Sequence, residues 1–297
     1  MPFQQFLQHL VNAISLGSLY ALIAIGYTMV YGILRLINFA HGDLVMVGAY
    51  SVFYAAAIFH LPWPLSFPLA ILLTGALGVL IERTAYKPLR EMPRINLFTS
   101  AIAVSFLLEN LSIVVFGGRP KAFDRPAFLN ANISIGRVRM LSYTPVIIFT
   151  GLVLFGGLMY VVHRTKMGMA MRALSRDIET TGLMGINTDR VIMFSFAIGS
   201  LLAAVGGILW GIKFPQINPL MGVTPGLKAF IAAVLGGIGN ITGAMIGGFL
   251  LGLIEIMILA FLPHLAGYRY AFAYAILVLV LLVRPTGIMG EAAREKV

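Results

Sequence analysis

Long apolar runs alternate with short polar connections throughout this chain of 297 residues. A membrane-spanning helix needs about 20 predominantly apolar residues. Runs near that length lie at 10–34, 39–60, 65–83, 97–116, 143–163, 190–212, 241–262 and, somewhat shorter, 270–283. The pattern predicts an all-α polytopic membrane protein with about eight or nine transmembrane or re-entrant helices.

The ninth apolar run, at 226–239, leaves the number of crossings open. Its length of about 14 residues suits either a re-entrant half-helix, which leaves eight crossings, or a short true span, which makes nine. A third alternative turns 39–60 into a short broken segment. Nine crossings with the N-terminus outside place more of the 21 Lys and Arg residues inside than outside, with Lys213 and Lys228 counted outside. Because Lys and Arg gather in cytoplasmic loops, we expect the C-terminus inside and the N-terminus outside.

Composition excludes several classes of protein. The chain is 59% hydrophobic and 11% charged, whereas soluble domains are about 25% charged. We assign its net charge of +10 to loops beside anionic lipid and expect no nucleic-acid partner. With no cysteine, five scattered histidines and no HExxH, GxSxG or phosphate-loop motif, the chain is expected to have no metal site, no cofactor and no catalytic residue.

Glycine recurs through the apolar stretch 226–255. Each glycine costs a soluble helix about 1 kcal/mol relative to alanine, whereas small residues let membrane helices approach closely. The four-residue spacing, which Gly239 begins, predicts packing ridges formed by Gly243, Gly247, Gly248 and Gly252.

The GGIGN sequence at 236–240 predicts a tight turn at membrane depth, which is tolerated only against protein or a watery cavity. This argument places four residues on a translocation path: Gly236, Gly237, Gly239 and Asn240.

Polar residues interrupt the apolar pattern near the second run. Because polar residues inside a membrane usually face a cavity or a partner, Asn38, His41 and Asp43 are also candidates for the translocation path. Gly42 is a candidate helix break. The alternative is a short cytoplasmic loop over 35–43. In later runs, Glu109, Asn110 and Glu255 are expected to be hydrogen-bonded packing residues.

The two longest polar stretches, 117–142 and 164–190, are expected to be an extracytoplasmic loop and a cytoplasmic loop of a single transmembrane domain spanning 1–297. The sequence ISIGRVRM in the first loop predicts a small hairpin.

The loop 164–190 has the pattern of a short amphipathic helix. Met171, Leu174 and Ile178 recur at helical spacing, and Asn187 or Thr188 would cap the next span. Charged residues on the other faces and two terminating glycines complete the segment: Arg176, Asp177, Glu179, Gly182 and Gly185. It rests on lipid or docks onto a partner protein, and its mixed charge favours docking.

Several motifs occur together and in order: INFAHGDL at 37–44, ERTAYKPLR at 82–90, SAIAVSFLLEN at 100–110, GINTDRVI at 185–192, INP at 217–219, GLKAFIAAVLGGIGNITGAMIGG at 226–248 and RPTGIMG at 284–290. From about residue 10 to the C-terminus, the chain resembles the permease subunits of bacterial branched-chain amino acid ABC importers, the LivH type.

This resemblance implies one half of a pore for leucine, isoleucine and valine in the bacterial inner membrane. It implies a second, homologous permease subunit, two cytoplasmic ATPases that use ATP and Mg²⁺, and a periplasmic amino-acid-binding protein. Met171–Ile186 matches the position of the family's ATPase-docking loop. Two alternatives remain, a permease for urea, amides or other amino acids and an ion-driven secondary transporter, which is expected to show repeats and a midplane ion site.

Overall fold

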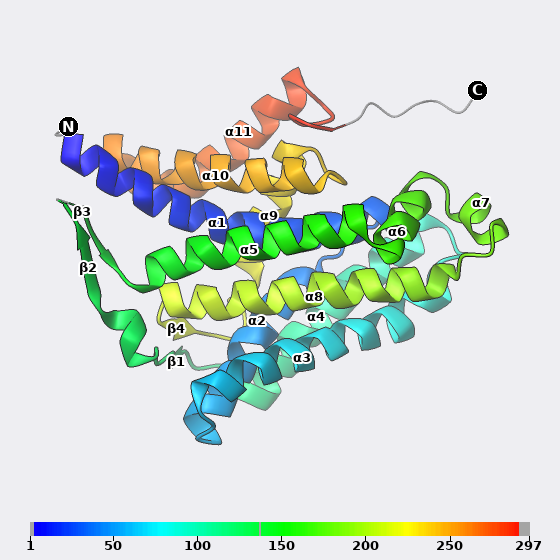
Figure 1. Cartoon of the computed structure of the whole chain (residues 1–297), viewed down its shortest axis with the longest axis horizontal. Helices are drawn as coiled ribbons and strands as arrows, with labels where there is room; N and C mark the ends of the chain where they lie inside the picture. The colour runs from blue at the N-terminus through cyan, green and yellow to red at the C-terminus, as the bar shows by residue number, and fades with distance from the viewer. Residues whose placement is uncertain (1–2, 137, 291–297) are drawn as a thin grey trace.

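The computed structural model describes residues 3–136 and 138–290, which are mostly helical. Most of the long helices run along one common direction (Figure 1). In the described residues, eight helical segments are long and apolar enough to cross a membrane. They are α1 (Phe3–Leu34), α2 (Ala40–Phe53) with the π-helical turn Tyr54–Ile58, α3 (Trp63–Ile81) with the turns Glu82–Tyr86 and Lys87–Leu89, α4 (Arg94–Phe116), α5 (Tyr143–Arg164), α8 (Thr188–Lys213), α10 (Ile241–Phe261), and α11 (Arg269–Val283) after the 3₁₀ turn Pro263–Tyr268. The predicted all-α polytopic fold is confirmed.

The short apolar run forms α9 (Val223–Gly236), a helix of 14 residues. Its length of about 21 Å is less than the thickness of a bilayer core. The strand β4 (Gln216–Ile217) and a turn precede it, and α10 follows it directly. α8 ends near the strands in Figure 1, whereas α10 begins toward the opposite end. This arrangement favours the short-span alternative, in which the extended stretch and α9 together make the ninth pass.

α1 is the central helix of the bundle. Almost all of its residues from Ala13 to Val30 are buried, and it contacts α5, α8, α9 and α10. In contrast, α4, α5 and α11 expose large apolar side chains such as Val114, Phe149 and Leu282. Apolar side chains that face outward from a hydrophobic bundle suit contact with lipid tails or another membrane chain.

The glycines of α10 form two ridges rather than one. On one side, Gly243 and Gly247 contact α9, and on the other, Gly248 and Gly252 contact α1. A Cβ atom at any of these four positions would overlap backbone atoms of the neighbouring helix. Gly239 belongs to neither ridge, because it lies in the turn before α10 with a φ of +96°; the expectation that it begins a ridge is wrong.

Short strands close one end of the bundle. β2 (Asn132–Ile135) pairs antiparallel with β3 (Val138–Leu141), which confirms the predicted hairpin. β1 (Lys121–Ala122) pairs with β4 and so ties the 117–142 loop to the chain that enters α9. The N-terminal end of α1 and the hairpin lie at one end of Figure 1, and α6 (Lys166–Arg176) and α7 (Ile178–Leu183) lie at the other.

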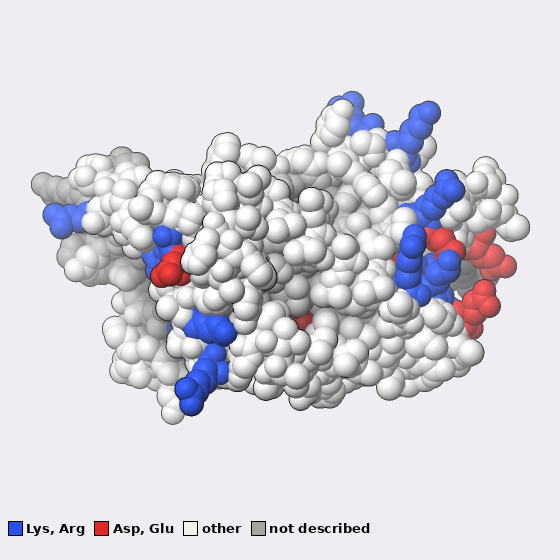
Figure 2. Space-filling model, turned by 90° about the horizontal axis from the view of Figure 1, so that it is seen from below, with Lys and Arg blue, Asp and Glu red and all other residues white. Residues whose placement is uncertain are grey.

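Charged side chains gather toward the two ends of the molecule. Figure 2 shows Lys, Arg, Asp and Glu mainly at those ends, with a broad, almost uncharged middle. This distribution is typical of a protein whose middle lies in hydrocarbon, because charged side chains inside a bilayer are costly.

Candidate functional site

The polar segment after α1 is folded into the bundle. α1 ends at Leu34 and α2 begins at Ala40, so the connection is shorter than the predicted loop 35–43. Asn38, His41 and Asp43 are all buried. The Tyr86 hydroxyl donates to Asn38 Oδ1 at 2.8 Å.

His41 and Gly42 hold α2 against its neighbours. His41 Nε2 lies 3.1 Å from the carbonyl oxygen of Ile23 on α1. Gly42 does not break the helix, contrary to the expectation, because it lies inside α2. Instead it allows α2 to touch α9, since a Cβ atom there would lie 2.6 Å from Gly222 O and 3.1 Å from Gly226 Cα.

A cavity of about 310 Å³ lies where α1, α2, α4 and α9 meet. Cavities that bind small molecules usually measure about 300–1,000 Å³ and are mostly apolar with a few polar groups. Here most of the wall is aromatic, aliphatic or glycine, and Asp43, Ser105 and Glu109 supply polar groups. The lining residues are Tyr27, Phe39, Gly42, Asp43, Ile102, Ser105, Phe106, Glu109, Gly222, Val223, Gly226, Leu227 and Phe230.

The two carboxylates of this cavity differ in their surroundings. Asp43 is 3% exposed, and the Ser105 hydroxyl donates to its Oδ2 at 2.6 Å. Glu109 is half-buried and makes no hydrogen bond or ion pair through its side chain to the described residues. The expectation that Glu109 is a hydrogen-bonded packing residue is therefore wrong, whereas Asn110 donates to its own helix at Phe106 O, 2.8 Å away.

Of the residues expected on the translocation path, Asp43 lines the cavity, while Asn38 and His41 bond within the bundle. The GGIGN residues do not line it either. They form the tight turn between α9 and α10, where φ is +108° at Gly237 and +96° at Gly239. Met289 N donates to Gly236 O at 2.8 Å, and Asn240 Nδ2 donates to Met289 O at 2.9 Å, so the C-terminal segment covers this turn.

The sequence prediction did not include the α4 side of the cavity in the translocation path. Four of its residues lie at i, i+3, i+4 and i+7, which is the spacing of one helix face: Ile102, Ser105, Phe106 and Glu109. That spacing, with a carboxylate and a hydroxyl inside an apolar run, was the signal that could have identified them.

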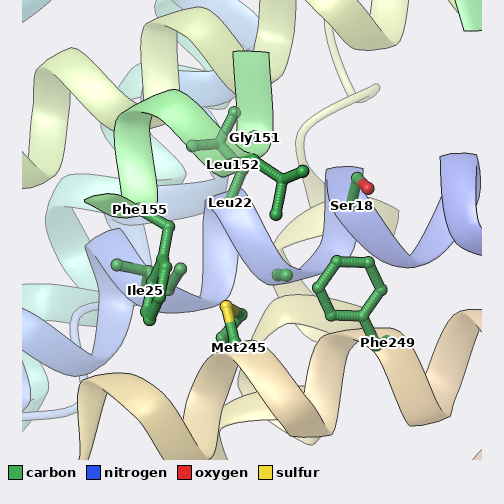
Figure 3. Close-up of a pocket in the computed structure, with 9 residues that line it drawn as sticks. Ser18, Leu22, Ile25, Gly151, Leu152, Phe155, Met245 and Phe249 are labelled. Atoms are coloured by element: carbon green, nitrogen blue, oxygen red, sulfur yellow. The ribbon is translucent and has the colours of Figure 1, made fainter. Parts of the chain in front are cut away.

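A second, much smaller pocket lies between α1, α5 and α10 (Figure 3). Its volume of about 10 Å³ is at the lower limit for one water molecule. Ser18 Oγ, a polar group on its wall, already donates to Ile14 O at 2.8 Å. We regard it as a gap in helix packing.

A buried ionic cluster joins α1, α9 and α10. Lys228 Nζ lies 2.8 Å from both carboxylate oxygens of Glu255 and donates to the Tyr20 hydroxyl at 2.7 Å. That hydroxyl donates to Glu255 Oε2 at 2.7 Å. Arg269 Nε of α11 lies 3.7 Å from Glu255. The packing role expected of Glu255 is confirmed. The expectation that Lys228 belongs with the basic residues outside the membrane is wrong, because it lies within α9 and is 4% exposed.

The predicted amphipathic segment forms two helices. Asp177 separates α6 from α7 with extended backbone angles, and its carboxylate accepts hydrogen bonds from Glu179 N at 3.0 Å and Thr180 N at 3.2 Å. Gly182 lies inside α7, and Gly185, with a φ of +81°, follows its end. Asn187 caps α8 by accepting from Arg190 N at 3.0 Å.

The apolar face of this segment also differs from the prediction. Met171 and Leu174 are buried in the chain's own core at 4% and 1% exposure, so they are not free to fill a partner's cleft. Ile178 is exposed at 41%, and two residues beyond it are more exposed: Leu183 at 84% and Met184 at 78%. Arg176 and Glu179 are also exposed.

A second charge cluster lies beside this segment. Arg90 contacts both Glu82 and Asp189, the latter at 2.7 Å, and Lys87 Nζ lies 2.6 Å from Asp189. These contacts join the end of α3 to the start of α8. Within the described part of the chain, no group of three or more His, Asp or Glu residues is placed to hold a metal ion.

Comparison with known proteins identifies the chain. Residues 9–281 match the family model described as branched-chain amino acid transport system / permease component. The chain belongs to this family. It is 44% identical to the high-affinity branched-chain amino acid transport system permease protein BraD of Pseudomonas aeruginosa, over 98% of each chain.

Other relatives agree over similar lengths. The chain is 43% identical to the corresponding permease protein LivH of Escherichia coli strain K12, over 99% of each chain. It is 26% identical to the ribose import permease protein RbsC of Haemophilus influenzae, over 92% of this chain and 83% of that one. No solved structure matches the chain. The chain is thus a multi-pass membrane transport subunit and not an enzyme.

Proposed function

We propose that the chain forms one half of the pore of an ATP-driven importer for leucine, isoleucine and valine. The observation that carries this proposal is the cavity between α2, α4 and α9, in a chain that matches branched-chain amino acid permeases along almost its whole length. The cavity offers apolar surface for an aliphatic side chain and polar groups for the charged ends of an amino acid.

The exposed surfaces suggest how partners bind. A second, homologous permease subunit would cover part of the apolar outer faces of the bundle. Two ATPases would bind at the end that carries α6 and α7, which we place in the cytoplasm. There Leu183 and Met184 would enter a cleft of the ATPase, and Arg176 and Glu179 would form pairs at its rim. A periplasmic binding protein would deliver the amino acid at the opposite end, in the inner membrane of a bacterium.

Contacts within the chain offer a route from the ATPase to the cavity. α7 leads through the Asn187 cap into α8. α8 lies close against α2, since a Cβ atom at Gly48 would lie 2.6 Å from Ala204 Cα. α2 carries Asp43 to the cavity wall. Movement of α7 on ATP binding would therefore shift α8 and α2 as packed bodies.

Reconstitution of the whole transporter tests the proposed function. The chain would be purified with its partner permease and ATPases, placed in lipid vesicles and supplied with the binding protein. We expect ATP-dependent uptake of labelled leucine that isoleucine and valine compete for and that urea and acetamide do not. Uptake of urea or amides alone would favour the first alternative, and leucine uptake driven by an ion gradient without ATP would favour the second.

A further inference from the structure

The cavity has the chemical features of a site for a zwitterion. Two carboxylates, Asp43 and Glu109, lie on its wall, and no lysine or arginine lies among the lining residues of the described chain. Ser105 fixes one oxygen of Asp43 by a hydrogen bond of 2.6 Å. Glu109 lies seven residues before the end of α4, about 10 Å along the helix. Carboxylates in an apolar cavity without a cation favour a positively charged ligand group.

The opposite wall suits an anion. Gly222, Val223 and Gly226, at the start of α9, line the same cavity. The first turn of a helix carries the positive end of the helix dipole and N–H groups without an intrahelical partner, and both favour a carboxylate. Here Val223 N already donates to Leu220 O at 3.2 Å and Gly226 N to Gly222 O at 2.9 Å, so among these three lining residues only Gly222 N has no hydrogen bond within the described chain. Broken helices that present such ends inside a membrane are common at transporter substrate sites.

We propose that this cavity is a transient binding site for the amino acid as it crosses, with Glu109 and Asp43 receiving its ammonium group and the start of α9 its carboxylate. The inference rests on the proposed function. Ile102, Phe106 and Phe230 then face the branched side chain. An apolar wall discriminates weakly between aliphatic side chains that differ by one methylene, so this site accepts leucine, isoleucine and valine alike.

The test uses the complete transporter in lipid vesicles with leucine as the probe. Glu109→Gln and Asp43→Asn each lower the leucine taken up per ATP hydrolysed by about tenfold or more, because a charge-assisted hydrogen bond to the ammonium group is weakened. Glu109→Gln leaves no partner unsatisfied, and the amide oxygen introduced by Asp43→Asn still accepts from Ser105. The matched control is Glu91→Gln, an exposed residue in the connection before α4, which leaves this ratio unchanged.

A second readout does not depend on ATP. Because the chain has no native cysteine, Ile102→Cys places a single thiol of this chain on the cavity wall. Leucine slows its labelling by a small thiol reagent, whereas 4-methylpentanoate, which lacks the ammonium group, does not. Glu109→Gln abolishes the protection by leucine.

Three results would overturn the inference. They are unchanged uptake per ATP in both carboxylate variants, protection by 4-methylpentanoate equal to that by leucine, and labelling that leucine does not affect. Failure of this inference differs from failure of the proposed function. If the proposed function is wrong, the wild-type transporter itself takes up no branched-chain amino acid.

Discussion

Two regions of this molecule bury carboxylates, and the carboxylates have different bonding partners in each. Glu255 is enclosed among three helices and bonded to Lys228 and to Tyr20 at 2.7–2.8 Å. Asp43 and Glu109 lie on the wall of a cavity, where Asp43 bonds to a hydroxyl and Glu109 to none of the described residues. The first region holds its own cation, whereas the second leaves room for a cation from outside.

We infer that this difference separates a structural charge from a functional one. A buried ion pair contributes little to net stability compared with apolar residues of similar shape, but loss of one partner is strongly destabilising. A carboxylate on a cavity wall contributes little to the fold, and such a residue inside a membrane is by default a candidate for contact with what enters the cavity. Removal of Glu255 should therefore damage folding, and removal of Glu109 should damage transport.

The largest expected effect is on the enclosed cluster. Glu255→Leu leaves Lys228 buried without its counter-ion, and we expect the free energy of unfolding to fall by about 3–5 kcal/mol. The triple change Tyr20→Phe, Lys228→Met and Glu255→Leu removes all three polar groups and should recover most of that loss. Unfolding of the purified permease by denaturing detergent measures both. Equal stability of wild type and Glu255→Leu would contradict the structural role of Glu255.

Helix packing around the cluster gives the next effect. Gly248→Leu places a side chain into the backbone of α1 at Ala21, and overpacking of this kind costs about 1–3 kcal/mol or more. Gly156→Leu is the matched control, because nothing lies within 4 Å of a Cβ atom there. The yield of monodisperse protein after extraction should fall only for Gly248→Leu. A similar fall in both variants would show that the introduced leucine side chain lowers the yield wherever it is placed, and not through the contact with α1.

A smaller effect is expected at the end that carries α7. Leu183→Ala should weaken binding of the ATPase about tenfold, since an apolar anchor at an interface contributes about 1–2 kcal/mol. Leu282→Ala on α11 is the control, because Leu282 is similarly exposed at 76% but lies in a different helix. Co-purification with the ATPase at increasing dilution measures the change. Binding that is insensitive to Leu183→Ala would return α7 to the role of a lipid-surface helix.

The smallest effect concerns the exposed charge cluster. Asp189 is about half exposed and bonds to Lys87 and Arg90. Exposed pairs contribute about 0.2–1 kcal/mol and are screened by salt. Asp189→Asn should therefore lower the melting temperature slightly at low salt and have less effect at high salt. A large loss at every salt concentration would show that this cluster is more than a surface feature.

The sequence predicted the helices well because each depends on its own composition. An apolar run of about 20 residues has few alternatives to a spanning helix, and the ISIGRVRM hairpin and the Asn187 cap are also local. Pairing between distant helices is not local. Lys228 and Glu255 are 27 residues apart, and Tyr20 and Lys228 are 208 apart, so nothing in the sequence showed that they meet.

The same reason explains the misplaced parts of the candidate site. In the sequence, the same pattern of polar interruptions includes Asn38, His41 and Asp43. Only the structure distinguishes them, because Asn38 bonds to Tyr86, His41 bonds to Ile23 and Asp43 lines the cavity. Met171, Leu174 and Ile178 recur at helical spacing in the sequence, but Asp177 divides the segment into two helices. Periodicity also cannot say whether an apolar face meets the chain itself or a partner.

The most direct test compares the two kinds of carboxylate in one transport assay. ATP-driven leucine uptake per folded transporter would be measured for the triple variant at Tyr20, Lys228 and Glu255 and for the double variant Asp43→Asn, Glu109→Gln. We predict that the triple variant stays within about twofold of wild type, because an apolar replacement restores the packing, and that the double variant loses about tenfold or more. Normal uptake by the double variant would contradict this role of the two cavity carboxylates, whatever the triple variant shows.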